Sequence, residues 1–332
     1  MSTLTLLIIV ILVALLFDFI NGFHDTANAI STVVGTGVLG LNSAIWMAAI
    51  FNLIGAFMGT AVASTIGKGV IDPNIIDLNI VLVGLIGAIT WNLITWWAGI
   101  PSSSSHALIG GLVGAAVVRS GWASVEQAGL IKIVKSLIIS PVVGLLLGAI
   151  MMIALTWMFR RCDPARSSRT FRFLQIFSAS SMALSHGSND AQKTMGIITM
   201  SLVIAGYHSK GPAGAFEVPF WVILASALSM FFGTAVGGKR IIKTMSKRIV
   251  ELKPVHGFAA ETSAAATIFT ATAMGLPVST THVISSAIAG VGSVKNLYGV
   301  KWGVSRRILI AWILTIPASA LAAALIELLF RI

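Results

Sequence analysis

Residues 22–30 read GFHDTANAI, and residues 187–195 read GSNDAQKTM. When the two stretches are laid over each other, Asp25 matches Asp190, 165 positions further along the chain. Two similar stretches this far apart indicate an internal duplication. The duplication decides the fold, because it divides the chain into two comparable halves.

A second pair of stretches supports the duplication. Residues 99–107 read GIPSSSSHA, and residues 275–283 read GLPVSTTHV. Here His106 matches His282, and each stretch carries a proline followed by a run of hydroxyl side chains. Because both pairs occur in the same order in both halves, the repeat extends over most of the chain.

The composition places both halves in a membrane. Of 332 residues, 56% are hydrophobic and 10% are charged, whereas soluble domains carry about 25% charged residues. Apolar stretches long enough to cross a hydrocarbon core of about 30 Å recur from end to end. The formal charge of +11 lies in short loops between these stretches and not in a basic stripe, which excludes a nucleic-acid-binding protein. The single cysteine, Cys162, excludes a disulfide framework and a cysteine-based metal site.

The lysine and arginine residues predict how the halves are oriented, because positive residues in short loops stay on the cytoplasmic side. If the second half repeats the first from the opposite side, fifteen basic residues lie inside, six lie outside and Lys193 lies within the membrane. This distribution predicts inverted repeats in the cell (plasma or inner) membrane, with both termini outside. The outside residues are Lys68, Arg119, Lys132, Lys135, Lys210 and Arg331. The predicted parts are residues 1–158 as the first membrane repeat, residues 159–171 as a basic cytoplasmic linker and residues 172–332 as the second, inverted repeat.

Residues 4–37 and 172–206 are too long for straight spans, since about 34 helical residues run about 51 Å. The dipeptide Asn21-Gly22 and residues 187–189 tolerate non-helical backbone, so a break is predicted at each. Transporters built from inverted repeats bind substrates and coupling ions at such breaks. The predicted fold is an all-α integral membrane protein with inverted-topology repeats, broken helices and two re-entrant hairpins. The other predicted segments are spans at 42–66, 131–158, 219–237 and 308–330, and hairpins at 79–118 and 257–291.

Asp25 and Asp190 fall in the middle of these long apolar segments. A carboxylate at bilayer depth costs at least about 2.5 to 3.5 kcal/mol on insertion scales, so something must offset it. Brought together near a pseudo-two-fold axis, the pair can hold a cation or share a proton. The structural alternative is that each aspartate caps the helix that follows it.

The residues three positions after the aspartates differ between the halves. Asn28 shares a helix face with Asp25, and the two side chains offer oxygen ligands suited to Na+. The matched residue is Lys193, whose ammonium group has no lone pair. Lys193 therefore repels Na+ from Asp190 while balancing its charge. This asymmetry favours proton coupling over sodium coupling.

The hydroxyl runs follow Pro101 and Pro277 and begin helices. Exposed backbone N–H groups and the positive end of a helix dipole bind anions, and hydroxyls add donors without adding charge. Two such tips facing each other would cradle a tetrahedral oxyanion; the alternative is that the hydroxyls bond to their own backbone or to a neighbour. The candidate anion-binding residues are Ser103, Ser104, Ser105, Ser279, Thr280 and Thr281, with Asn28 beside them.

Three histidines and one glutamate stay open between a direct role and a structural one. A histidine beside a carboxylate can relay protons, but a histidine at a helix start is as often a hydrogen-bond partner. Glu261 has no acidic match in the first half, and it is either a proton carrier or an interface residue. The histidines are His24, His106 and His282.

The stretches GFHDTANAI and SHGSNDAQKTMG, together with IPSSSSHA and LPVSTTHV, resemble the duplicated signature of the PiT inorganic phosphate transporter family. The resemblance implies an inverted-repeat fold, symport of inorganic phosphate and often a homodimer. It also implies that Asp25, Asn28 and Asp190 lie at the substrate and coupling-ion centre, with the hydroxyl tips around the anion. Sodium-coupled members carry an Asn-containing copy where Lys193 stands. The chain thus resembles bacterial proton-coupled members, some of which carry phosphate as a neutral complex with a divalent metal.

The expected function is import of phosphate together with H+, with no cofactor besides the coupling ion. Na+-coupled transport of phosphate or sulfate is the alternative. A passive anion channel is a different class, and it would need a continuous polar path, whereas the polar residues here gather at one depth. An enzyme is not expected, because the hydroxyls occur in duplicated runs and not as one serine beside a base.

Overall fold

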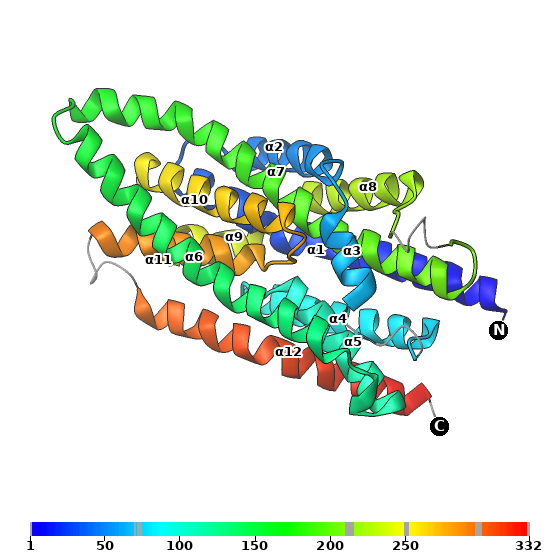
Figure 1. The fold of residues 1–332 in the computed structure, drawn as a ribbon. Coiled ribbons are helices and arrows are strands. Elements are labelled where there is room, and N and C mark those ends of the chain that lie inside the picture. The colour runs from blue at the N-terminus through cyan, green and yellow to red at the C-terminus, as the bar shows by residue number, and fades with distance from the viewer. Residues whose placement is uncertain are drawn as a thin grey trace.

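The chain forms an elongated bundle of α-helices that run roughly along one direction (Figure 1). The computed structural model describes residues 2–69, 71, 75–209, 216–248, 252–295 and 301–330. Within these ranges the α-helices follow one another as α1 to α12, with a 3-10 helix at Trp122–Ser124. Lys210 and Arg331, which the charge distribution assigns to the outer side, lie outside the described residues.

The two longest central helices, α1 (Thr3–Gly35) and α7 (Pro164–Ile204), start at opposite ends of the bundle (Figure 1). The breaks predicted at Asn21-Gly22 and residues 187–189 are wrong, because both helices continue through these positions. Residues 164–171, placed in a linker by the sequence, form the first turns of α7.

The glycines at the expected breaks serve close packing instead of a bend. A Cβ atom on Gly22 would lie 2.7 Å from the Met230 carbonyl oxygen, and one on Gly187 would lie 2.2 Å from the Asn52 carbonyl oxygen. Helix backbones approach this closely in membranes only where the intervening residue is small. Gly22 thus lets α1 pack on α8 (Phe220–Val236), and Gly187 lets α7 pack on α2 (Leu41–Ala56).

Gly187→Ala is expected to lower the melting temperature of the detergent-solubilised protein, because the new methyl group must push α2 away from α7. Overpacking of this kind costs about 1 to 3 kcal/mol. Gly303→Ala is the matched control, since a Cβ atom there meets nothing within 4 Å and alanine favours a helix. Equal melting temperatures for the two variants would contradict the packing role of Gly187.

Broken helices occur at another place in each half. The helix α2 and the short helix α3 (Ala61–Gly69) meet at an angle of 73°. Their counterparts α8 and α9 (Lys239–Arg248) are separated by Gly237-Gly238, where Gly237 has a φ of +73°. The stretch 42–66, predicted as one crossing, is therefore a bent pair.

A re-entrant hairpin follows the broken helix in each half. Gly99 and Gly275 end the entering helices with a φ of +66° each, a conformation that favours glycine. After a short loop the chain turns back as a second helix. The hairpins predicted at 79–118 and 257–291 are thus present. Their helices are α4 (Leu78–Ala98) with α5 (Ser104–Ser120), and α10 (Pro254–Ala273) with α11 (Thr280–Lys295).

The last helix of each half packs against the hairpin of the other half. The helix α6 (Gln127–Phe159) packs on α11, and α12 (Trp302–Phe330) packs on α5. Ser136 Oγ of α6 donates to the Pro277 carbonyl at 2.6 Å, and the matched Trp312 Nε1 of α12 donates to the Pro101 carbonyl at 3.2 Å. Matched contacts of this kind therefore hold the two halves together.

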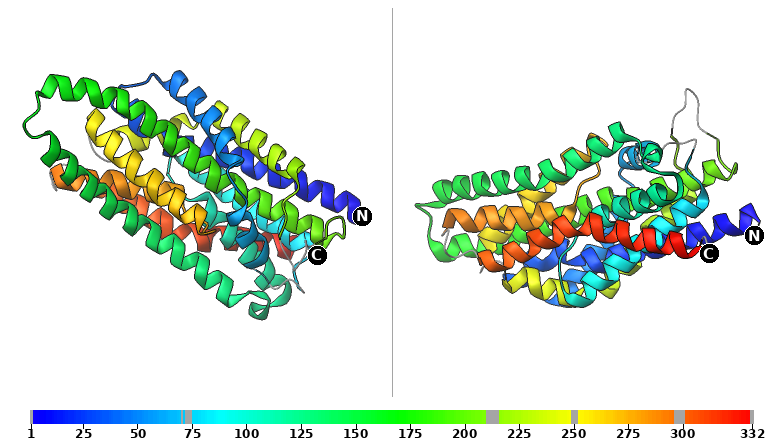
Figure 2. Two further views of the ribbon diagram at one scale, coloured as in Figure 1. Left: turned by 45° about the horizontal axis from the view of Figure 1, so that its top comes forward. Right: turned by 90° about the horizontal axis from the view of Figure 1, so that it is seen from below.

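The two halves have opposite directions. The helix α6 runs toward the end where α7 begins, and α12 runs back, so both termini lie at one end of the bundle (Figures 1 and 2). Together with the exchanged contacts, this confirms the inverted-repeat fold.

The outer surface fits a lipid environment. Large apolar side chains such as Leu12, Ile138 and Ile313 are 60% to 73% exposed. Four of the described helices are long and apolar enough to cross a membrane, and the bent pair α2–α3 would make a fifth. The protein is therefore a multi-pass membrane protein. The four helical stretches are Thr3–Gly35, Leu78–Ala98, Gln127–Phe159 and Ser305–Leu329.

Candidate functional site

A polar layer lies in the middle of the bundle between two apolar clusters. Apolar residues from positions 7–23 of α1 and 191–202 of α7 belong to one cluster. Those from positions 27–33 of α1 and 171–183 of α7 belong to the other. The aspartates of the duplicated stretches lie between them, and the tips of both hairpins reach the same depth. Polar groups at this depth are costly unless they partner one another.

Asp25 is held by neighbours from α1 and the first hairpin. His24 Nδ1 lies 2.7 Å from Asp25 Oδ1 and donates to it. Ser104 Oγ lies 2.8 Å from Asp25 Oδ2 and 2.5 Å from Asn21 Oδ1. A hydroxyl has one proton, so these two acceptors share it. The tip of the first hairpin is thereby tied to the carboxylate.

Asp190 forms a buried ion pair with Lys193, one helix turn away. Lys193 Nζ lies 2.6 Å from Asp190 Oδ1, 2.5 Å from Ser105 Oγ and 3.2 Å from the Val278 carbonyl oxygen. These three partners use all three ammonium protons. Because Lys193 is only 1% exposed, the full set of partners is what offsets the cost of burying the charge.

Asn28 and Lys193, which occupy matched positions, make matched contacts. Asn28 Nδ2 donates to Thr281 Oγ1 at 2.9 Å and to Thr280 Oγ1 at 3.2 Å. Lys193 donates to Ser105, the equivalent of Thr281 in the first hairpin. Each residue therefore reaches the hairpin of the other half. The contacts of Asn28 and Lys193 thus follow the pseudo-two-fold symmetry, but only Lys193 carries a charge.

The six hydroxyl residues of the tips divide into two groups. Ser103 Oγ accepts from the His106 N–H at 3.2 Å, and Ser279 Oγ accepts from the His282 N–H at 3.3 Å, so the first serine of each run caps its own helix. The following residues, Ser104 and Ser105 in one tip and Thr280 and Thr281 in the other, contact α1 or α7. All six are at most 4% exposed, so the centre is closed in this conformation.

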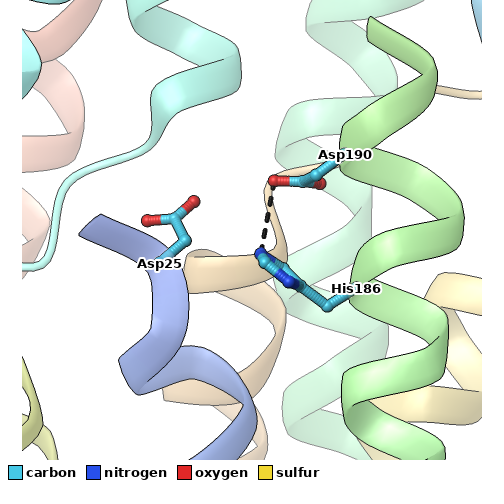
Figure 3. Close-up of side chains that lie close together, drawn as sticks. All are labelled: Asp25, His186 and Asp190. Carbon is cyan, nitrogen blue, oxygen red and sulfur yellow. Dashed lines mark ion pairs between the residues drawn. The ribbon is translucent and has the colours of Figure 1, made fainter. Parts of the chain in front are cut away.

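Asp25, His186 and Asp190 form a compact titratable cluster (Figure 3). One ligand atom from each lies within 4.8 Å of the others. Asp25 projects from α1 toward the two α7 side chains, and His186 Nε2 lies 3.6 Å from Asp190 Oδ2. Two carboxylates and an imidazole at this spacing can hold a cation or pass a proton.

The sequence interpretation missed Asn21 and His186. Asn21 Nδ2 lies 3.4 Å from Asp190 Oδ2, so it bridges the two halves. The two residues are matched by the same offset of 165 positions that relates the aspartates. Each lies one turn before its aspartate and therefore on the same helix face. Extending the repeat comparison by one helix turn would have found both.

The remaining histidines have different surroundings. His24 lies beside Asp25, as described above. The rings of His106 and His282 stack on each other with centroids 4.5 Å apart, and His282 stacks on Trp312 at 3.8 Å. These two histidines thus join the hairpins across the pseudo-two-fold axis.

Glu261 of α10 lies away from the centre and joins three helices. Its carboxylate accepts from Thr32 Oγ1 of α1 at 2.5 Å and from Gln175 Nε2 of α7 at 3.0 Å. Ser178 Oγ of α7 donates to the other carboxylate oxygen. With three donors and no exposure, Glu261 fits the interface role that the sequence left open.

Glu261→Leu is expected to lower the melting temperature strongly, because it leaves three buried donors without an acceptor. Each such donor costs about 1 to 3 kcal/mol. Glu261→Gln is the matched control, since its amide oxygen still accepts and hydroxyl groups can reverse their roles. A Leu variant that melts at the same temperature as the Gln variant would show that these bonds do not hold α1, α7 and α10 together.

Comparison with known proteins agrees with the fold and the motifs. The model of a family described as "Phosphate transporter family" matches residues 21–323. A "Probable low-affinity inorganic phosphate transporter" of Rhizobium meliloti is 48% identical over 321 residues, covering 96% of this chain and 95% of that protein. One of the same description from Bacillus subtilis is 47% identical over 319 residues, covering 96% and 95%. A solved structure titled "The sodium-dependent phosphate transporter" superposes with a TM-score of 0.90 at 25% identity, covering 98% of this chain and 99% of that chain.

The family match extends over both duplicated stretches and both hairpins. The expectation of a transporter, and not an enzyme, is thereby confirmed. On this evidence the chain belongs to the phosphate transporter family, the PiT family of inorganic phosphate transporters.

Proposed function

We propose that the protein is a secondary active symporter that imports inorganic phosphate together with H+. The observation that carries the choice of H+ is the ion pair between Lys193 and Asp190, 2.6 Å apart at the centre of the bundle. A second cation site would need a ligand atom with a lone pair at this position, and the ammonium group of Lys193 has none. A proton, which needs only a basic atom, remains compatible with this centre.

The hydroxyl tips are the proposed phosphate site. The N-termini of α5 and α11 approach each other from opposite ends of the bundle, and each is followed by buried hydroxyls. Helix N-termini favour anions, and neutral donors hold phosphate less tightly than arginine would. Weak binding suits a site that must also release its substrate. The proposed residues are Ser103, Ser104, Ser105, Ser279, Thr280 and Thr281, with Asn28 as a further donor.

Charge balance is the reason for co-transport. Moving one elementary negative charge against a negative-inside potential costs about 2.3 kcal/mol per 100 mV. Co-entry of H+, bound by a carboxylate in or beside the polar layer of Asp25 and Asp190, offsets this cost. A neutral complex of phosphate with a divalent metal would serve the same end, because it carries no net charge across the membrane.

Sodium coupling is the second candidate. It is supported by the oxygen atoms of Asp25 and Asn28 on one helix face and by the similar solved structure, which is described as a sodium-dependent phosphate transporter. Under this alternative one Na+ would bind in the first half only, because Lys193 occupies the matched position. Sulfate is the alternative anion.

We further propose that the termini face outward from the plasma or inner membrane and that the chain forms a homodimer. The basic turn between α6 and α7 lies at the end of the bundle opposite the termini (Figure 1), which suits the cytoplasmic side. In this view the first repeat is residues 1–158, and the second repeat is residues 164–332, because the first turns of α7 belong to it.

Uptake of labelled phosphate into proteoliposomes tests the proposal when H+ and Na+ gradients are imposed separately. Uptake is expected to follow an inwardly directed H+ gradient without Na+, and excess unlabelled sulfate is expected not to compete. Uptake that follows only the Na+ gradient would overturn proton coupling. Equal competition by sulfate would overturn the choice of phosphate.

A further inference from the structure

Asp18 is a buried acid of α1 that the duplicated motifs do not include. Its exposure is 0%, and neither carboxylate oxygen has a hydrogen-bond partner. It lies seven residues before Asp25 on the same face of the helix, about 10.5 Å toward the N-terminal end. Its place is therefore beside the polar layer, on the side of the bundle where both termini lie.

The other buried carboxylates in the described part of the chain each have a donor. Asp25 has His24 and Ser104, Asp190 has Lys193, and Glu261 has three donors. Glu327 is paired with Arg119. An ionised carboxylate with no donor is the costly state in such surroundings, whereas the neutral acid is accommodated. Asp18 thus suits reversible binding of a proton better than the carboxylates that are already held.

The polar groups near Asp18 come from α7. Thr194 faces it, and the charges of Asp190 and Lys193 act on it. The Thr194 hydroxyl is itself buried and makes no hydrogen bond of ordinary geometry. The helices α4 and α8, which also pack on α1, carry no titratable residue. Other titratable groups on the helices packed around α1 lie nearer its C-terminal half. They are His186 of α7 beside Asp190, His282 of α11 next to the tip that Asn28 contacts, Lys239 and Arg240 at the start of α9, which packs beyond Phe23, and Glu261 of α10, which contacts Thr32.

Asp18 and Lys193 both break the repeat. The position that matches Asp18 is Ala183, and the position that matches Lys193 is Asn28. The first half therefore has one extra acid and the second half one extra base, on two helices that pack together. Asp18 and Lys193 act on each other through opposite charges, so these two differences between the halves concern the same part of the site.

We propose that Asp18 binds the proton that is transported with phosphate, an inference that rests on the proposed proton coupling. Lys193 holds both hairpin tips through Ser105 and the Val278 carbonyl. While Asp18 is protonated, Asp190 is the carboxylate that keeps Lys193 in this position. After phosphate has left, Asp18 loses its proton and becomes a second carboxylate that draws Lys193 away from the tips. This step lets the empty site return, and exchange of one phosphate for another does not need it. The proton enters from one side, binds the carboxylate and leaves to the other side, and no other group is consumed.

The test is Asp18→Asn in proteoliposomes, with two assays of the same sample. Net phosphate uptake driven by an H+ gradient is expected to fall at least tenfold, and the proton influx recorded by a trapped pH dye is expected to disappear. Exchange of labelled for unlabelled phosphate without a gradient is expected to persist. Asp163→Asn is the matched control, because Asp163 is an exposed helix cap and asparagine caps equally well.

The outcomes separate this inference from the proposed function. An Asp18→Asn variant with unchanged gradient-driven uptake and proton influx would overturn the role of Asp18 alone. A wild-type protein that ignores the H+ gradient would overturn proton coupling and this inference with it. If Asp18→Asn does not fold, Asp18→Glu answers the same question, since its longer acid is expected to restore uptake with a shifted pH midpoint. An unchanged midpoint would count against Asp18.

Discussion

Asp25→Asn is expected to reduce phosphate uptake about 100-fold while the protein still folds. The change keeps the shape of the side chain but removes the charge that accepts from His24 and Ser104 at 2.7 and 2.8 Å. Hydrogen bonds to a charged group contribute about 1.5 to 3 kcal/mol each, and about 1.4 kcal/mol corresponds to a factor of ten. The same change removes the negative charge that the proposed symport needs at the centre. Initial rates of labelled phosphate uptake measure the effect.

The matched control for this variant is again Asp163→Asn, which removes an acid far from the centre. Its uptake rate is expected to equal that of the wild type. Melting temperatures should be recorded for both variants, so that a loss of transport can be separated from a loss of fold. Retention of transport by Asp25→Asn would show that the centre of the polar layer does not carry the coupling.

The architecture could be predicted from the sequence where the two halves support each other. The paired Gly-x-Pro tips predict two hairpins, and Gly99 and Gly275 indeed turn the chain at matched places. The prolines inside α6 and α12, Pro141 and Pro317, show the same offset of 176 positions. Features that recur at one constant offset rarely do so by chance. A few matched residues are therefore enough to predict the inverted repeat.

The position of the helix breaks could not be predicted in the same way. The prediction took Gly22 and Gly187 as weak points of the backbone, because glycine tolerates non-helical conformations. Glycine equally lets two helices approach closely, and only the partner decides between the two uses. The partners, Met230 and Asn52, lie far away in the sequence. Local sequence therefore could not distinguish a bend from a contact.

For the candidate site, sequence comparison favours residues that match between the two halves. Residues that matched across the halves were found, and the structure brings Asp25, Asp190 and both hydroxyl tips together. His186 was missed because the compared stretches begin one residue after it, at Gly187, and Asp18 was missed because it matches an alanine. The comparison of repeats finds what the halves share. Residues that couple transport to one ion are expected where the halves differ, and the mismatch between Asn28 and Lys193 identified Lys193 in this way.

Lys193→Met is expected to lower the melting temperature and abolish phosphate uptake. The change leaves the Asp190 carboxylate buried without its ion-pair partner, which costs about 3 to 5 kcal/mol. It also removes the donors to Ser105 and to the Val278 carbonyl, so the two hairpin tips lose their common support. Unlike methionine, arginine at this position keeps the charge, but its planar fork cannot reproduce the three directions of the ammonium protons.

The double variant Asp190→Asn/Lys193→Met is expected to recover most of the lost melting temperature but not the transport. It leaves no unpaired charge in the polar layer, because both members of the pair are neutral. The two single variants and the double variant form a cycle whose interaction energy is expected to be about 2 to 3 kcal/mol, the upper part of the range for residues in contact. Recovery of stability without recovery of uptake would separate the structural part of the pair from its part in coupling. Strictly additive effects would instead mean that Lys193 supports the hairpin tips and does not balance Asp190.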